Sequence, residues 1–141
     1  MATYLFKTEP DEFAYSDLEE QREGRWDGVT NAQALIHLRA CKVGDEVFVY
    51  HTGDEKAIVG LAKVTRAAYE DPASPGKTSK GEPKHAVVDL RAVRALHNRV
   101  TLAQIKADKR FAAFDLVKNS RLSVMPVPAA LDKLIRKWAE I

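Results

Sequence analysis

The stretch YLFKTEP, residues 4–10, carries the first predicted strand of the chain and a cluster of polar side chains at its end. Its first three residues are aromatic or apolar and favour extended structure. Pro10 ends the strand because proline has no amide hydrogen to donate to a neighbouring strand. Lys7, Thr8 and Glu9 stand just before it and place an amine, a hydroxyl and a carboxylate side by side. Such a cluster is either a solvated strand end or part of a binding site.

Further strands are predicted in the middle of the chain, where β-branched and aromatic residues are frequent. They cover EVFVYH (residues 46–51), AIVGLAKVT (57–65) and HAVVDLRAVRAL (85–96), and a last short strand falls within RLSVMPV (121–127). Gly60 lies inside the second of them and permits a bulge or a close approach of another backbone. Strands gathered between helical segments favour an α+β domain built around a curved sheet or a small barrel.

Capping residues and apolar spacing predict the helices. Ser16 is predicted to cap a short acidic helix that ends near Gly24, and Asn31 is predicted to cap the helix AQALIHLRAC. Thr101 offers a cap for another short helix, and Pro128 suits the first position of a closing amphipathic helix. A loop rich in proline, glycine and lysine is expected over residues 70–84.

Length and composition are those of an ordinary globular protein. The chain has 141 residues, of which 45% are apolar and 30% charged, so we expect one domain over residues 1–141 and exclude a disordered chain or a fibre. No apolar run approaches the roughly 20 residues that span a bilayer, and no secretion signal is recognised at the N-terminus. Cys41 is the single cysteine, which fits a reducing compartment. We expect a cytoplasmic monomer without a membrane partner.

Charge is unevenly distributed along the chain. Residues 1–70 contain 8 Lys and Arg against 13 Asp and Glu, whereas residues 71–141 contain 14 against 7. A basic half indicates an anionic partner, because clustered Lys and Arg replace counterions on a phosphate backbone. The alternative is that both halves share one fold and that their charges mix on its surface.

Two further stretches contain candidate residues for a binding site. Trp26 stands among polar residues in RWDGVTNAQA, residues 25–34, and such a tryptophan either anchors a loop on the core or offers a flat face for stacking a base. Tyr50, His51 and Thr52 end their strand as a polar triplet, as the first strand does. If the two strands are neighbours, their ends form a pocket with donors and acceptors over an apolar floor.

Taken together, these segments resemble the EVE domain of the PUA-like superfamily. The matching stretches are YLFKTEP, WDGVTNAQA, KVGDEVFVYHT, IVGLAKV followed by AYEDP, and LSVMPV. They occur in the family's order and extend from about residue 4 to residue 127. The resemblance implies a curved, mostly antiparallel sheet of pseudo-barrel form with flanking helices. It also implies a pocket for a nucleobase of DNA or RNA, with modified cytosines the expected ligands, and no cofactor or metal.

The resemblance implies a role in ligand binding for each candidate residue. Lys7 favours a phosphate or a base carbonyl, and Glu9 accepts from an exocyclic amine, as carboxylates do with cytosine. Trp26 and Tyr50 are expected to stack on the base. The predicted base pocket comprises Lys7, Thr8, Glu9, Trp26, Asn31, Tyr50, His51, Thr52, Ser123 and Met125, and Lys118 and Arg121 are predicted to contact phosphates.

The chain also departs from the family pattern. Thr30, Ala32 and Met125 stand where the family more often has Arg, an aromatic residue and Gln. The first two changes remove a phosphate contact or widen the pocket in this interpretation. The third removes an amide that reads a base edge, so it bears on the identity of the ligand. Thr8 and Thr52 replace serines and keep the hydroxyl.

The residues also allow two functions other than nucleobase binding. ASCH relatives within the PUA-like group are small amidohydrolases acting on acylated cytidine, and Lys7, Thr8 and Glu9 supply a base, a nucleophile and a carboxylate of the types they use. Side chains alternate between faces along a strand, however, so Thr8 is expected to point away from its two neighbours. The third interpretation is a protein-interaction domain whose polar strand ends are solvated.

Overall fold

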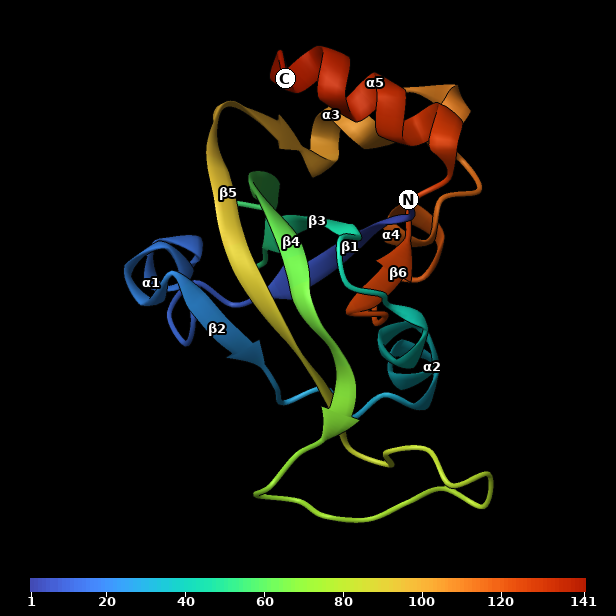
Figure 1. Cartoon of the computed structure of the whole chain (residues 1–141). Helices are drawn as coiled ribbons and strands as arrows, with labels where there is room; N and C mark the ends of the chain where they lie inside the picture. Colours follow the sequence, from blue (N-terminus) through green and yellow to red (C-terminus); the bar gives the residue numbers. More distant parts are fainter.

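The computed structural model describes all residues from 1 to 141 as one six-stranded sheet flanked by helices (Figure 1). The strands are β1 (Thr3–Thr8), β2 (Glu23–Trp26), β3 (Glu46–His51), β4 (Ala57–Glu70), β5 (Ala86–Thr101) and β6 (Val124–Pro126). The helices are α1 (Tyr15–Gln21), α2 (Ala32–Ala40), α3 (Leu102–Lys106), α4 (Asp115–Lys118) and α5 (Ala129–Ala139), with a 3-10 turn, η1, over Lys109–Phe111. None of these helices combines the length and the apolarity that a bilayer crossing requires.

The sheet is curved and mostly antiparallel, as predicted. Its strand order is β2-β5-β4-β3-β1-β6, and only the pairing of β1 with β3 is parallel. The sheet does not close, because β2 and β6 are its two edges and do not pair with each other. Helix α2 packs against the neighbouring strands β4 and β5 and also against β6, which lies at the far edge of the sheet. The curvature therefore brings the two ends of the sheet towards one helix and leaves a gap between the edges.

The two long central strands bend through irregular pairing. The register between β4 and β5 shifts at four places, one of them between Ile58 and Gly60. Each shift adds twist and lets a long strand curve. Gly60 also faces the ring of Tyr15, whose hydroxyl donates to the Leu61 carbonyl at 2.6 Å. The predicted bulge at Gly60 is confirmed, whereas the group that approaches it closely is the Tyr15 side chain of α1 and not another backbone.

The core lies inside the curve of the sheet. Val47 to His51 of β3 are all buried, and the apolar residues of β1 and β6 pack beside them. Phe6, Phe48 and Phe111 are the largest of the fully buried side chains. A central strand buried on both faces fits the run of apolar residues from which it was predicted.

Several predicted boundaries were wrong, each for a local reason. Ser16 lies inside α1, and the helix begins after Ala14, whose amide donates to the Asp17 carboxylate at 2.8 Å. Pro128 precedes α5 as its N-cap. Trp26 ends β2, an edge strand too short to show an alternating pattern, and so does not lie in a polar loop. Asn31 and Thr101 cap α2 and α3 as predicted.

Candidate functional site

A cavity lined by five of the predicted residues opens in the gap between the two edges of the sheet. It has a volume of about 410 Å³, within the roughly 300–1,000 Å³ of ordinary ligand sites. We call it the edge cavity, since Trp26 of β2 stands on one side and Ser123, just before β6, on the other. Its lining residues are Lys7, Thr8, Glu9, Glu12, Phe13, Arg25, Trp26, Asp27, Gly28, Val29 and Ser123.

Backbone and side-chain hydrogen bonds fix the wall formed by the end of β1. The Lys7 amide donates to the Ser123 carbonyl at 2.9 Å, which ties β1 to the segment before β6. The Glu9 carbonyl accepts from the amides of Glu12 and Phe13, both at 2.9 Å, so the chain turns back on itself. The Thr8 hydroxyl donates to the Phe13 carbonyl at 2.7 Å and secures the turn. Glu9 and Glu12 are thereby held beside the same cavity.

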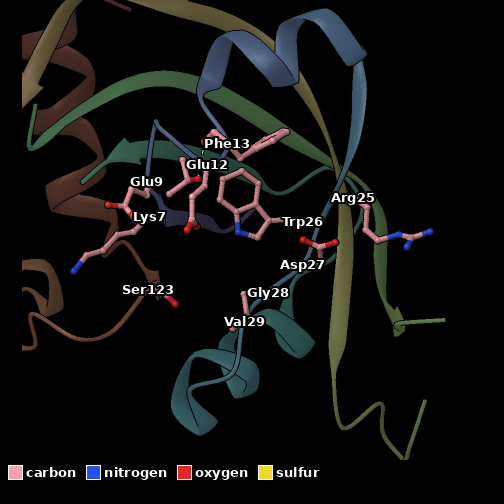
Figure 2. A pocket seen from close by; sticks show the side chains of 11 residues that line it. Lys7, Glu9, Glu12, Phe13, Arg25, Trp26, Asp27, Gly28, Val29 and Ser123 are labelled. Atoms are coloured by element: carbon pink, nitrogen blue, oxygen red, sulfur yellow. Dashed lines mark hydrogen bonds between the residues drawn. The ribbon is translucent and has the colours of Figure 1, made fainter. Parts of the chain in front are cut away.

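Trp26 forms part of the cavity wall and also belongs to the core. Its ring lies 5.5 Å from that of Phe6 and 5.8 Å from that of Phe13, centroid to centroid, and only 5% of the residue is exposed. The interpretation as an anchor on the core is therefore confirmed. The indole nitrogen makes no hydrogen bond within the chain and points towards open space beside Gly28 in Figure 2. Stacking of a base on Trp26 stays a prediction, limited to the small exposed part of the ring.

The charges of the edge cavity are arranged asymmetrically. Glu9, Glu12 and Asp27 line it, and none of them makes an ion pair. Figure 2 shows Arg25 and the amine of Lys7 directed outward on opposite sides. Three unpaired carboxylates favour a ligand that presents hydrogen-bond donors, because ionised carboxylates only accept. They also disfavour a phosphate inside this cavity.

Lys7 is held by the backbone rather than by an acid. Its amine donates to the Ser120 carbonyl at 2.9 Å, and the residue is partly buried. Burial lowers the pKa of the Lys7 amine below its ordinary value. No carboxylate of this protein forms an ion pair with the Lys7 amine within 4 Å.

A second, smaller cavity lies on the other side of Lys7. We call it the lysine cavity; its volume is about 170 Å³ and its lining residues are Lys7, Tyr50, Thr52, Gly53, Lys56, Leu102, Lys106, Leu116, Val117 and Ser120. The strand ends are neighbours as predicted, since Lys7 is opposite Tyr50 and the Thr52 amide donates to the Thr8 carbonyl at 3.0 Å. The two polar triplets do not share one pocket, however. Tyr50 and Thr52 face the lysine cavity, and only Lys7 lines both.

Three predicted base contacts are corrected by the structure. His51 is 5% exposed and its ring nitrogens are both engaged, Nε2 with the Tyr15 amide at 3.0 Å and Nδ1 with Glu55 at 3.1 Å. The Asn31 side-chain oxygen accepts from the Ala34 amide at 3.0 Å as the cap of α2, away from the cavity lining. Met125 is fully buried in β6 and cannot touch a ligand. The first two residues serve secondary structure, and the third serves the core.

The predicted phosphate contacts are exposed and unpaired. Lys118 ends α4 and Arg121 follows it, and neither makes an ion pair within the chain. Both lie near Ser120, whose carbonyl holds Lys7. Of the departures from the family pattern, Thr30 and Ala32 are exposed outside the edge cavity and Met125 is buried. None of these three alters its lining.

Sequence reasoning missed half of the edge cavity. The omitted lining residues are Glu12, Phe13, Arg25, Asp27, Gly28 and Val29. Asp27, Gly28 and Val29 directly follow Trp26, so the singled-out tryptophan was the available signal for them. Glu12 and Phe13 enter the wall only because the turn after Pro10 folds back, and no residue pattern indicated that turn.

Comparison with known proteins adds three relationships. A model of the EVE domain family matches residues 2–138. Human thymocyte nuclear protein 1 is 34% identical over 124 residues, which cover 74% of this chain and 55% of that protein, so the chain spans about half the length of this relative. A structure of human THYN1 in complex with 5-methylcytosine-containing DNA superposes with a TM-score of 0.88 at 28% identity and covers 100% of this chain and 99% of that one.

Two other solved structures show how far the similarity extends. A protein from Rhodopseudomonas palustris is 38% identical with a TM-score of 0.87, and the match covers 99% of this chain and 94% of that chain. An ASCH protein from Zymomonas mobilis is 10% identical with a TM-score of 0.58, covering 96% of each chain. The second likeness is one of fold alone.

Proposed function

The chain belongs to the EVE domain family, and from this premise we propose that it binds a modified cytosine base of a nucleic acid in the edge cavity. The observation that carries the proposal is the gathering of Glu9, Glu12 and Asp27 in one cavity, where none of them forms an ion pair within 4 Å. A cytosine presents an exocyclic amine, and carboxylates are the side chains that accept from it. The solved complex of the human relative with 5-methylcytosine-containing DNA supports the choice of base.

The remaining polar groups of the cavity suit the other atoms of the base. The Trp26 indole N–H and the Ser123 hydroxyl make no hydrogen bond within the chain and are available as donors. The ring nitrogen and carbonyl oxygen of cytosine are acceptors. Phe13 and Val29 add apolar wall against which a 5-methyl group packs. A base inside a duplex has to leave the stack to reach such a cavity, so a single strand or an extruded base is the proposed form.

Tryptophan fluorescence tests the location of the site. In a Trp138→Phe background, where Trp26 is the remaining tryptophan, a short single strand with one 5-methylcytosine is expected to change the emission saturably. Trp138 packs against Phe111 at 5.3 Å and does not line the edge cavity, so this background leaves the site intact. Parallel titrations with an RNA strand of the same sequence, and with a strand that carries unmodified cytosine instead, rank these ligands by affinity.

A charge-neutral variant supplies the control for that titration. Glu9→Gln together with Glu12→Gln keeps the size of both side chains and is expected to weaken the modified strand about tenfold or more, because hydrogen bonds to charged groups contribute about 1.5–3 kcal/mol each. Glu23→Gln with Glu82→Gln changes the net charge equally at exposed residues outside the cavity. If both pairs weakened binding to the same extent, the edge cavity would not be the site.

We also propose that the chain is not an amidohydrolase for acylated cytidine. Lys7 and Thr8 both line the edge cavity, contrary to the expectation from strand alternation. Their reactive groups are engaged apart, however, since the Lys7 amine donates to Ser120 and the Thr8 hydroxyl donates its proton to the Phe13 carbonyl. A threonine nucleophile needs a base that takes this proton. Burial raises the pKa of the Cys41 thiol to about 12, so no thiolate replaces it.

The expected result is no release of cytidine from an N4-acylated cytidine above the rate without protein. Chromatography of the reaction mixture measures it. Release that disappeared in both Thr8→Ala and Lys7→Ala would establish the enzymatic alternative instead.

A further inference from the structure

The lysine cavity is positively charged and has no internal counterion. Lys7, Lys56 and Lys106 line it, its lining contains no carboxylate, and none of the three lysines makes an ion pair within 4 Å. The acidic residues nearest in sequence, Asp54 and Glu55, line a neighbouring groove that Lys56 and Lys106 also line, and neither forms an ion pair with these lysines within 4 Å. Glu55 is already bound to Arg99 at 2.9 Å and to the His51 ring. Three like charges without a partner repel one another unless an anion joins them.

Hydroxyl groups add hydrogen-bonding capacity to the same cavity. Tyr50 lines the lysine cavity, and its hydroxyl makes no hydrogen bond within the chain and is free to donate to a ligand. The Ser120 side chain adds a second hydroxyl, whereas the Thr52 hydroxyl already donates to the Thr8 carbonyl at 3.4 Å. Ammonium and hydroxyl donors around one small cavity are the groups that bind an oxyanion.

We infer that the lysine cavity binds a phosphate group, and that this phosphate belongs to the nucleotide whose base occupies the edge cavity. The second half of the inference rests on the proposed function. The volume of about 170 Å³ is below that of sites for drug-sized molecules and suits a single tetrahedral anion. Lys7 lines both cavities, so base and phosphate sites are adjacent.

The two cavities carry opposite charge, which fixes the orientation of a nucleotide. The carboxylates of the edge cavity repel a phosphate and accept from the base, whereas the lysines attract the phosphate and offer the base amine no acceptor. A bound phosphate also opposes the lowering of the Lys7 pKa by burial, since an adjacent anion favours the charged amine. Lys7, which is partly buried, thereby lies between the phosphate in one cavity and the base in the other.

Titration with inorganic phosphate tests the anion site independently of any base. Backbone amide NMR signals of Thr52, Gly53 and Leu102 are expected to shift saturably with phosphate and not with chloride at the same ionic strength. The variant Lys56→Gln/Lys106→Gln removes two charges and keeps most of each stem, and it is expected to lose the saturable shift. Lys133→Gln/Lys137→Gln, two exposed and unpaired lysines of α5, is the matched control and keeps it. Shifts that never saturate, or that persist in the Lys56 and Lys106 variant, overturn the inference.

Nucleotide binding then identifies the source of the phosphate. The parent protein is expected to bind the 5′- or 3′-monophosphate of 5-methyldeoxycytidine about tenfold more tightly than the nucleoside, as charge-assisted hydrogen bonds predict. The Lys56 and Lys106 variant is expected to keep its affinity for the nucleoside and to lose that preference. An unchanged preference in this variant overturns the assignment to the nucleotide. Failure of the nucleoside to bind, beside a saturable phosphate site, refutes the proposed base function and leaves an anion site for free phosphate.

Discussion

Trp26→Ala is expected to lower the free energy of unfolding by about 3–5 kcal/mol, the range measured for deletion of a buried tryptophan or phenylalanine. Trp26 is 5% exposed and packs between the rings of Phe6 and Phe13, so its removal leaves a cavity in the core. A domain of this size has a total stability of about 5–15 kcal/mol. Urea denaturation followed by circular dichroism measures the change.

Trp26→Phe is the informative companion variant. It keeps an aromatic ring against Phe6 and Phe13 but removes the indole N–H that faces the edge cavity, so we expect a smaller loss of stability and a loss of ligand affinity of roughly fivefold for one neutral hydrogen bond. Loss of binding in Trp26→Ala alone cannot separate recognition from folding. If Trp26→Ala denatured at the same urea concentration as the parent, the packing described for this residue would be incorrect.

Gly60→Ala is expected to destabilise the protein through overpacking, which typically costs about 1–3 kcal/mol, and at least by the upper end of that range. An added Cβ would overlap the ring atoms Cε1 and Cζ of Tyr15. The ring cannot retreat cheaply, because its hydroxyl donates to the Leu61 carbonyl at 2.6 Å and the Tyr15 amide donates to His51 at 3.0 Å. Moving it breaks buried hydrogen bonds at about 1–3 kcal/mol each.

A second strand glycine provides the control. At Gly24 an added Cβ would meet the side-chain oxygen of Gln21 at 2.6 Å, but Gln21 is exposed and its side chain rotates freely into solvent. Leu18 Cδ1 at 3.0 Å is the contact that yields less easily, because Leu18 is fully buried. We expect Gly24→Ala to lower the stability clearly less than Gly60→Ala does. Thermal denaturation of both variants beside the parent protein measures the difference. Equal losses at the two positions would show that loss of the glycine, and not the Tyr15 ring, determines the effect.

Local patterns predicted the strands well where the residues were buried on both faces. β3 has the predicted bounds, and the apolar beginning of β4 was enough to place it. β4 and β5 extend beyond their predicted ends because cross-strand pairing continues there, as between Tyr69 and Val87 and between Ala57 and Thr101. Pairing partners come from elsewhere in the chain, so local composition does not indicate where pairing stops.

The candidate site was predicted in part for the same reason. Lys7, Glu9, Trp26 and Ser123 were singled out from three different segments, and the structure brings them to one cavity. His51 was misassigned because its role is set by the amide of Tyr15, which local sequence does not place opposite it. The division of the polar strand ends between two cavities depends on which way Lys7 extends, and only the packed chain decides that.

The gap between β2 and β6 also bears on when the protein becomes able to bind. β6 is the last strand to be synthesised, and it pairs with β1, the first, through bonds such as that of the Lys7 amide to the Ser123 carbonyl. Strand pairings between distant parts of a chain form late in folding, because the entropy cost of closing the long loop between them has to be met first. A nascent chain that has left the ribosome only as far as β5 lacks the Ser123 wall, and also the Ser120 carbonyl that holds Lys7. The proposed site is therefore incomplete until β6 has been translated.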